Sequence, residues 1–299
     1  MPSNRADGRA VTCPRLCECG CLTRQRRYPS DLSDEQWAVI CPLLPAPLWR
    51  TPLGGRPEKH CRRAVVDAIL YVTDNGIKWR AMPADFPPWR TVYGIFAVWQ
   101  RDRVTGGLVD DLRAAARRAA GRDPEPSAGC IDAQSVHESA EGVVPAASSG
   151  FDPHKKVNGR KRHILTDTLG FLITVAVTPA STQDRDAAFP LVAAAACRGR
   201  HRLSHIWADN AYQGDWIAWT RYHHGVTIEI VARPEGMKGF QVLPRRWVVE
   251  RSLAWITRRR RCARDYERLP GHHAAMVQWA AILQMTRRLA RLPQTQPWV

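Results

Sequence analysis

The chain has 299 residues, of which 44% are hydrophobic, and it carries a formal net charge of +16. No window approaches 18 consecutive apolar residues, so we expect no membrane span, and the polar first ten residues lack the apolar region of a secretory signal. The odd count of nine cysteines argues against a closed disulfide framework. The large positive excess favours a polyanionic partner, usually nucleic acid.

Residues 1–30 have the composition of a flexible, basic leader. This segment holds four clustered cysteines, namely Cys13, Cys17, Cys19 and Cys21. A zinc site is the alternative interpretation, but the spacing lacks the usual CxxC pairs. We therefore favour the leader.

Residues 31–120 predict a small all-helical domain. The SDEQW string begins a helix that is capped by Ser33, and a proline-rich loop follows it. A second helix ends near Asn75, a third begins near Trp89, and a fourth covers residues 107–120. The aromatic stripe of the third helix is most simply core, and a DNA-reading helix is the alternative.

A linker-like break at residues 121–129 precedes a different pattern, in which short apolar runs alternate with helices over residues 130–292. The expected strands are 130–136, two runs joined as a hairpin at Leu169-Gly170, HIWAD and TIEIVARP, and the expected helices are 184–196, 216–223, 247–260 and 272–289. This order resembles an RNase H-like α/β fold, with a mixed five-stranded sheet and flanking helices.

Three acids occupy suggestive positions in this domain. Asp132 lies within a strand, where an unpaired carboxylate is costly; Asp209 ends a strand; Glu250 lies beside the apolar face of a helix. Taken singly, Asp132 can be a hydrogen-bonded acid, Asp209 a turn residue and Glu250 a partner of Arg246. Taken together, they predict a shared catalytic metal site, because two Mg²⁺ ions held ~4 Å apart by carboxylates can cleave a phosphodiester.

Basic residues cluster around these acids, and we expect them to contact DNA phosphates. The predicted DNA-binding residues are Lys155, Lys156, Arg160, Lys161, Arg162, Arg245, Arg246, Arg251, Arg258, Arg259, Arg260 and Arg261. The alternative for the RRRR run is a solvated helix face. Arg185 is interpreted as a helix-start ion pair with its acidic neighbours.

Four long strings resemble the insertion-sequence 5 family of DDE transposases: YPSDLSDEQW, GRKRHILTDTLGFLITVAVTPASTQDRDAA, ADNAYQG and RRWVVERSLAWITRRRRCARDYE. The resemblance implies a DDE triad at Asp132, Asp209 and Glu250, with Mg²⁺ as cofactor and Mn²⁺ as a substitute. It also implies a bacterial cytoplasmic protein that cleaves the inverted-repeat ends of an insertion sequence and joins them to target DNA. Its implied partners are double-stranded DNA and a second copy in a synaptic homodimer.

The chain departs from the Y–R–E–K pattern that related enzymes carry around the glutamate. Arg246 and Glu250 match its central pair, but Leu243 replaces the tyrosine and Thr257 the lysine, for which Arg258 is the natural substitute. Residues 1–27 match nothing in the resemblance. Two other hypotheses remain: a non-catalytic DNA-binding relic, and a nuclease of the same fold that cleaves without joining strands.

Overall fold

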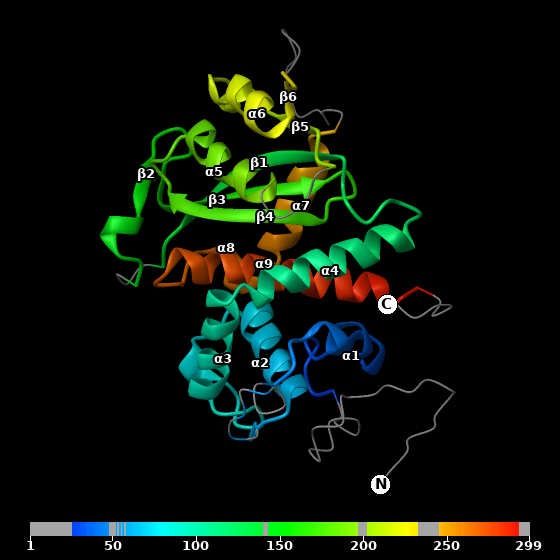
Figure 1. The fold of residues 1–299 in the computed structure, drawn as a ribbon. Helices are drawn as coiled ribbons and strands as arrows, with labels where there is room; N and C mark the ends of the chain where they lie inside the picture. Colours follow the sequence, from blue (N-terminus) through cyan, green and yellow to red (C-terminus); the bar gives the residue numbers. More distant parts are fainter. Residues whose placement is uncertain are drawn as a thin grey trace.

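The computed structural model describes residues 26–47, 58–139, 143–196, 202–232 and 245–292, with the single positions 52, 54 and 56. The predicted leader up to residue 25, with its four cysteines, lies outside the described residues, as does Leu243. In Figure 1 the sheet lies above, and the long helices α4 (Val104–Ala119) and α9 (Pro270–Leu289) lie between it and the other N-terminal helices.

The N-terminal region is helical, as predicted. Its elements are α1 (Asp34–Ile40), η1 (Cys41–Leu43), α2 (Arg62–Asn75), η3 (Trp79–Ala81), α3 (Trp89–Arg101) and α4 (Val104–Ala119). The predicted cap is confirmed, since the Ser33 side chain and Gln36 form a reciprocal capping box. α2 ends at left-handed Gly76, and α4 begins three residues before the predicted start.

The sheet has six strands: β1 (Ala128–His137), β2 (Gly150–Asp152), β3 (Val157–Asp167), β4 (Leu172–Pro179), β5 (His205–Ala208) and β6 (Thr227–Ile230). Their order is β2-β3-β1-β5-β6, and β4 pairs with β3. The prediction of five strands is wrong by one, because β2 is only three residues long and shows no readable alternation. The predicted β3–β4 hairpin is confirmed, and β1 begins within the stretch predicted as a linker.

Five α-helices and two short turns complete the described chain: η4 (Ala146–Ser148), α5 (Asp184–Ala196), η5 (Asn210–Tyr212), α6 (Trp216–His224), α7 (Trp247–Thr257), α8 (Arg260–Ala263) and α9 (Pro270–Leu289). The prediction of a single helix over residues 247–260 is wrong, because α7 ends at Thr257 and α8 begins at Arg260. The chain becomes extended at Arg259, where the guanidinium reaches Asp74 of α2 at 2.6 Å. This contact with the N-terminal region accompanies the break between α7 and α8.

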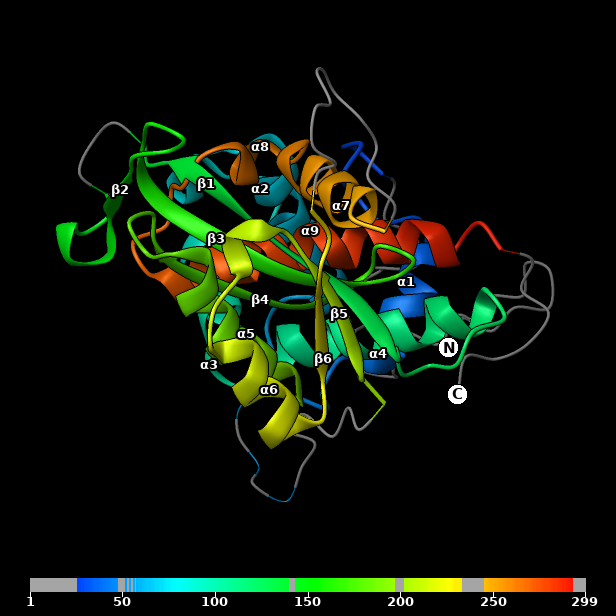
Figure 2. The same cartoon turned by 90° about the horizontal axis from the view of Figure 1, so that it is seen from above.

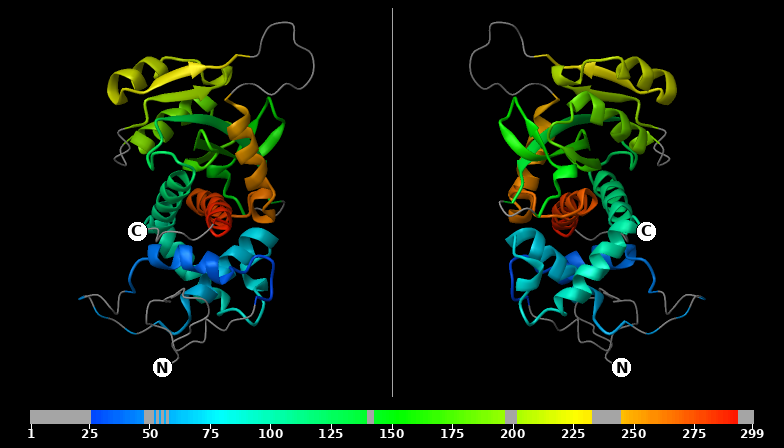
Figure 3. Two further views of the ribbon diagram at one scale, coloured as in Figure 1. Left: turned by 90° about the vertical axis from the view of Figure 1, so that its right-hand side faces the viewer. Right: turned by 90° about the vertical axis from the view of Figure 1, so that its left-hand side faces the viewer.

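The two faces of the sheet are covered differently, as Figures 2 and 3 show. Ile131 and Leu165 pack with α5 and α6 on one face, whereas Cys130 and Ile164 pack with α7 and α9 on the other. The second core continues without a break into α1–α4, so the predicted helical and catalytic regions share one hydrophobic core. None of the helices in the described ranges is both long and apolar enough to cross a bilayer.

The β3–β4 turn fixes the position of α7. Asp167 Oδ1 accepts hydrogen bonds from the Leu169 and Phe171 amides, and the Ser252 hydroxyl of α7 donates to the Gly170 carbonyl at 2.8 Å. Gly170 has a positive φ of 88°, and a Cβ there would lie 2.9 Å from the Ser252 Oγ. Only glycine allows this close approach without strain.

Gly170→Ala is therefore expected to lower the free energy of unfolding by about 2–3 kcal/mol, which combines left-handed strain with a displaced α7. Urea denaturation measures the loss. Gly225→Ala is the matched control, because Gly225 has φ 64° and no heavy atom of the described residues lies within 4 Å of the added Cβ. Equal losses in the two variants would show that the contact with α7 contributes nothing.

Candidate active site

Two of the predicted acids come from neighbouring parallel strands. Cys130 of β1 is in register with Trp207 of β5, and Asp132 and Asp209 each lie two residues farther along. Because side chains alternate with a period of two and adjacent strands lie ~4.8 Å apart, both acids point to the same face of the sheet. That face is the one on which Cys130 and Trp207 pack with α7.

The third acid comes from α7 and meets the second through one arginine. The Arg246 Nη2 atom lies 3.4 Å from Asp209 Oδ2 and 3.6 Å from Glu250 Oε1. The predicted Arg246–Glu250 pair is thus observed, and the same guanidinium also contacts Asp209. The side chains of Asp209 and Glu250 remain partly open to solvent, at 29% and 40% exposure.

Among the residues that the structure describes, no cation forms an ion pair with the carboxyl group of Asp132. Burial raises the pKa of Asp132 to about 7, and the charges of Asp209 and Glu250 act in the same direction. A hydrogen bond from the Ala133 amide (2.7 Å) and the charge of Arg246 oppose the rise without cancelling it. Three carboxylates served by one arginine are an environment that favours binding of a cation.

Asp209 also acts as a turn residue. Its Oδ1 accepts a hydrogen bond from the Ala211 amide at 2.9 Å and caps η5. Its Oδ2 faces Arg246 instead. One oxygen of Asp209 therefore shapes the chain, and the other points toward the acidic cluster.

Within the described ranges, no three His, Cys, Asp or Glu side chains are arranged to hold a metal ion as they stand. The Arg246 guanidinium lies between Asp209 and Glu250. The donor set nevertheless fits a hard divalent cation in kind, because its ligands are carboxylate oxygens. Sharing an ion would require Arg246 to withdraw from between the two acids.

The structure separates the predicted DNA-binding residues into two groups. Lys155, Lys156, Arg245, Arg258 and Arg260 are exposed, and Arg246, Arg251 and Arg259 are half-buried. Arg160, Lys161, Arg162 and Arg261 are buried, which corrects the expectation that these four contact phosphates.

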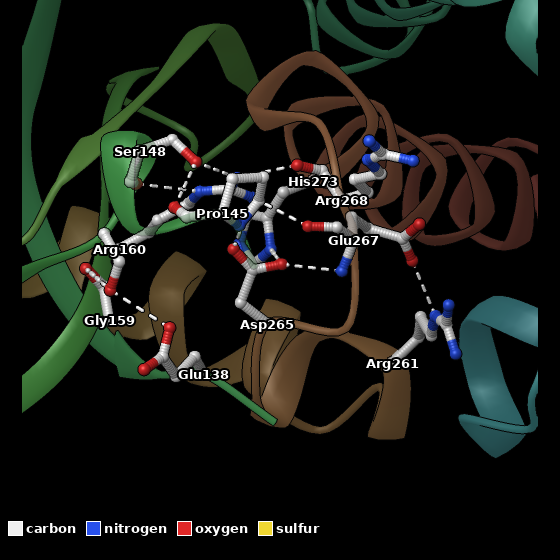
Figure 4. Close-up of polar contacts among 11 residues, drawn as sticks. Glu138, Pro145, Ser148, Gly159, Arg160, Arg261, Asp265, Glu267, Arg268 and His273 are labelled. Atoms are coloured by element: carbon white, nitrogen blue, oxygen red, sulfur yellow. Dashed lines mark hydrogen bonds and ion pairs between the residues drawn. The ribbon is translucent and has the colours of Figure 1, made fainter. Parts of the chain in front are cut away.

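Each of the four buried residues has internal partners. Arg160 pairs with Asp265 (Figure 4), and Arg261 with Glu267. Lys161 Nζ lies 3.0 Å from Asp184 and 3.5 Å from Asp152. Asp184 is thus taken by Lys161, and the predicted ion pair of Arg185 is found with Asp186 alone, at 3.9 Å.

Arg162 contacts Thr257, which stands at the lysine position of the Y–R–E–K pattern. Its Nη2 donates to the Thr257 Oγ1 at 2.9 Å and its Nη1 to the Cys262 carbonyl at 2.7 Å. A buried guanidinium from β3 thus reaches the side chain that replaces the lysine of the pattern. The role predicted for Arg258, as a substitute for that lysine, stays a prediction. Arg258 is exposed and follows Thr257 at the C-terminal end of α7.

Sequence reasoning missed two neighbours of the acids. Tyr212 is fully buried, and its hydroxyl has no hydrogen-bond partner among the residues that the structure describes. Burial and the nearby charges of Asp132, Asp184 and Asp209 raise its pKa. The second neighbour is a ladder on α7, in which Arg251 stacks between Trp247 and Trp255 at 4.4 and 4.5 Å. Two features of the sequence could have revealed these neighbours: the ADNAYQG string, which contains Tyr212, and the four-residue spacing of Trp247, Arg251 and Trp255.

Two sequence families match this chain. The family described as "Putative transposase of IS4/5 family" covers residues 32–109, and the "Transposase DDE domain" family covers residues 123–285. The second match spans more than half of the chain and includes the positions of all three acids.

Two proteins of insertion element IS402 from Burkholderia cepacia are similar to the chain. The first, an "uncharacterized 16.2 kDa protein", is 33% identical over 90 residues, which are 28% of this chain and 61% of that protein. The second, a "putative transposase", is 28% identical over 143 residues, or 46% of this chain and 67% of that protein. The chain thus spans less than two thirds of the first relative. No solved structure matches the chain. On the family matches, the chain belongs to the DDE transposases of the IS4/IS5 group.

Proposed function

We propose that the protein is a DNA transposase that cleaves the inverted-repeat ends of an insertion sequence and joins them to target DNA. The observation that carries this proposal is the convergence of Asp132, Asp209 and Glu250 from two parallel strands and one helix. The matching families are transposase families, and DDE domains of this kind generally use divalent metal ions.

Asp132, Asp209 and Glu250 would hold the metal ions, Mg²⁺ or in its place Mn²⁺. Bound there, such ions would supply the Lewis-acid stabilisation that phosphodiester cleavage and strand transfer need. Arg246 balances the charge of two of these acids. It can turn toward a DNA phosphate, because an arginine binds a phosphate and a carboxylate with the same geometry.

DNA would lie along the solvent-accessible side of α7. Glu250 and Arg258 lie two helical turns apart on its accessible side, and Arg260 continues the cationic surface beyond the helix. Arg245 precedes the helix and stacks on Trp207 at 4.5 Å. Together with Lys155 and Lys156, these residues form the proposed phosphate-binding set. We further propose that two copies bring the two ends together as a dimer.

Asp209→Asn is expected to retain DNA binding and to lose cleavage. The amide keeps the size of the side chain and can still accept the Ala211 hydrogen bond, but it removes a negative charge from the metal site. The measurement is an assay with a labelled inverted-repeat end and Mg²⁺ or Mn²⁺, read as cut and joined products, with a gel shift for binding. Asp186→Asn, on the exposed surface of α5, is the matched control and should cleave normally.

The products separate the proposal from its two alternatives. Joined strands support a transposase, whereas nicking without joining supports a nuclease. A gel shift without cleavage in the parent protein supports a relic that only binds DNA. Cleavage by the Asp209→Asn variant at the parent rate would contradict the assigned site.

A further inference from the structure

The β2–β3 hairpin presents an aromatic ring and cationic side chains to solvent. We define the hairpin tip as residues 151–156, which lie at one extreme edge of the molecule (Figure 2). Phe151 is 55% exposed, and residues 153–156 (PHKK) are all exposed. An exposed phenylalanine next to exposed basic side chains offers an apolar and a cationic contact to a ligand at one place.

The hairpin tip is held rigidly from below. Asp152 is buried and accepts hydrogen bonds from the His154 and Lys155 amides at 3.0 and 3.1 Å. Its other oxygen accepts the Ser135 hydroxyl at 2.5 Å and lies 3.5 Å from Lys161 Nζ. This network fixes the backbone of the tip, so its exposed side chains are presented at low entropic cost.

The charge of the hairpin tip complements a polyanion. Asp152 shares Lys161 with Asp184, and the nearby Glu138 is engaged by hydrogen bonds from Ser149 and Asn158. In the described part of the chain, neither exposed Lys155 nor exposed Lys156 has a carboxylate partner, so both can bind phosphate, and Phe151 lies close to them in the sequence. Cationic side chains that flank an apolar wedge are typical of proteins that partly unstack and bend duplex DNA.

The sheet also sets the distance from this tip to the acids. β1 runs from Asp132 to His137, which pairs with Gly159, and Gly159 pairs in turn with Gly150 at the start of β2. Five residues of strand span ~17 Å, and the step across two strand spacings adds ~10 Å to the side. Phe151 lies one register position farther along, so the tip is more than ~20 Å from Asp132, which corresponds to at least ~6 base pairs of B-DNA. A duplex that places a phosphate at the acids can thus reach the hairpin tip.

We propose that the hairpin tip is a second DNA contact, in which Lys155 and Lys156 bind backbone phosphates and the Phe151 ring inserts between adjacent base pairs. This inference rests on the proposed function, because it assumes that the acids engage the same duplex. It assigns to Phe151 a task that charge alone does not supply, namely local distortion of the DNA at least ~6 base pairs from the cleaved bond.

The phosphate contacts are tested by titrating the full chain with a duplex that spans one transposon end and its flank, in EDTA, at 50–200 mM KCl. Lys155→Gln/Lys156→Asn, with asparagine chosen because Lys156 has a φ of 53°, is expected to bind about tenfold more weakly. The slope of log K against log salt should fall by about 2. Arg122→Gln removes an exposed charge elsewhere. It should leave the affinity unchanged and lower the slope of log K against log salt by no more than about 0.5. An unchanged slope in the double variant would overturn the phosphate contact.

The wedge is tested with 2-aminopurine placed at successive positions of the same duplex. We expect a several-fold rise in fluorescence at one base step with the parent protein and with Phe151→Tyr, and no rise with Phe151→Ala. The same rise with Phe151→Ala would overturn the wedge. So would a change from dimer to monomer in Phe151→Ala with unaltered fluorescence, since the surface would then join two copies. These readouts need no cleavage, so failure of the catalytic proposal appears separately, as unaltered cutting by Asp209→Asn.

Discussion

Asp132→Asn is expected to abolish cleavage and at the same time to stabilise the protein above pH 7 in the presence of a chelator. Loss of a metal-binding carboxylate removes several kcal/mol of transition-state stabilisation, which corresponds to a rate reduced ~10³-fold or more. The gain in stability has a separate cause, because burial and two neighbouring acids raise the pKa of Asp132 to about 7.

The direction of the pH dependence follows from proton binding. An unfolded aspartate has a pKa near 3.9, so between pH 4 and pH 7 the folded protein binds more protons than the unfolded chain. Stability contributed by this group is therefore full below the unfolded pKa, falls as pH rises through this window, and is lost above pH 7. Asparagine removes the charge and with it the loss.

We expect Asp132→Asn to raise the free energy of unfolding by about 2 kcal/mol at pH 8 and by almost nothing at pH 4. This value is smaller than the full shift at ~1.4 kcal/mol per pKa unit, since the residue is partly open to solvent. Urea denaturation in EDTA at both pH values measures it, with Asp186→Asn as the surface control. A gain at pH 4 that equals the gain at pH 8 would show that the charge of Asp132 is not the cause.

The placement of the acids was predictable because each depends on local pattern. Asp132 interrupts an apolar run, Asp209 ends one, and Glu250 lies next to the apolar face of a helix, so the topology of the sheet brings all three to one face. The Ser33 cap and the Leu169-Gly170 turn were predictable for the same reason. Each of these features is encoded within a few consecutive residues.

Which arginines are buried and which are exposed was not predictable, because the partners that bury them lie far away in the chain. Arg160 and its partner Asp265 are 105 positions apart, and Arg259 meets Asp74 across 185 positions. A basic string looks the same whether its side chains face water or enter a core. Only the fold separates Lys155 and Lys156, at an exposed turn, from Arg160 and Arg162 in the following strand.

Arg160→Met is expected to destabilise the protein by about 3–5 kcal/mol, because it leaves the buried Asp265 with His273 as its remaining partner. Arg160 Nη1 lies 3.0 Å from Asp265 Oδ2, and both side chains are inaccessible to solvent. The same guanidinium donates to the Glu267 and Arg268 carbonyls at 2.8 and 2.9 Å (Figure 4). It thus joins β3 to the segment that leads into α9, and thermal or urea denaturation reports its loss.

Lys155→Met provides the matched comparison, because it removes the same charge from an exposed turn five residues earlier. It should change stability by no more than about 0.5 kcal/mol while weakening DNA binding, whereas folded Arg160→Met should bind DNA as the parent does. Arg160→Met/Asp265→Leu should regain part of the lost stability, since neither charge is then buried alone. The opposite pattern, with a stable Arg160→Met that fails to bind DNA, would return Arg160 to the DNA interface. The buried ion pair makes that outcome incompatible with this fold, because Arg160 cannot reach a phosphate without breaking its contact with Asp265, which would then keep only His273.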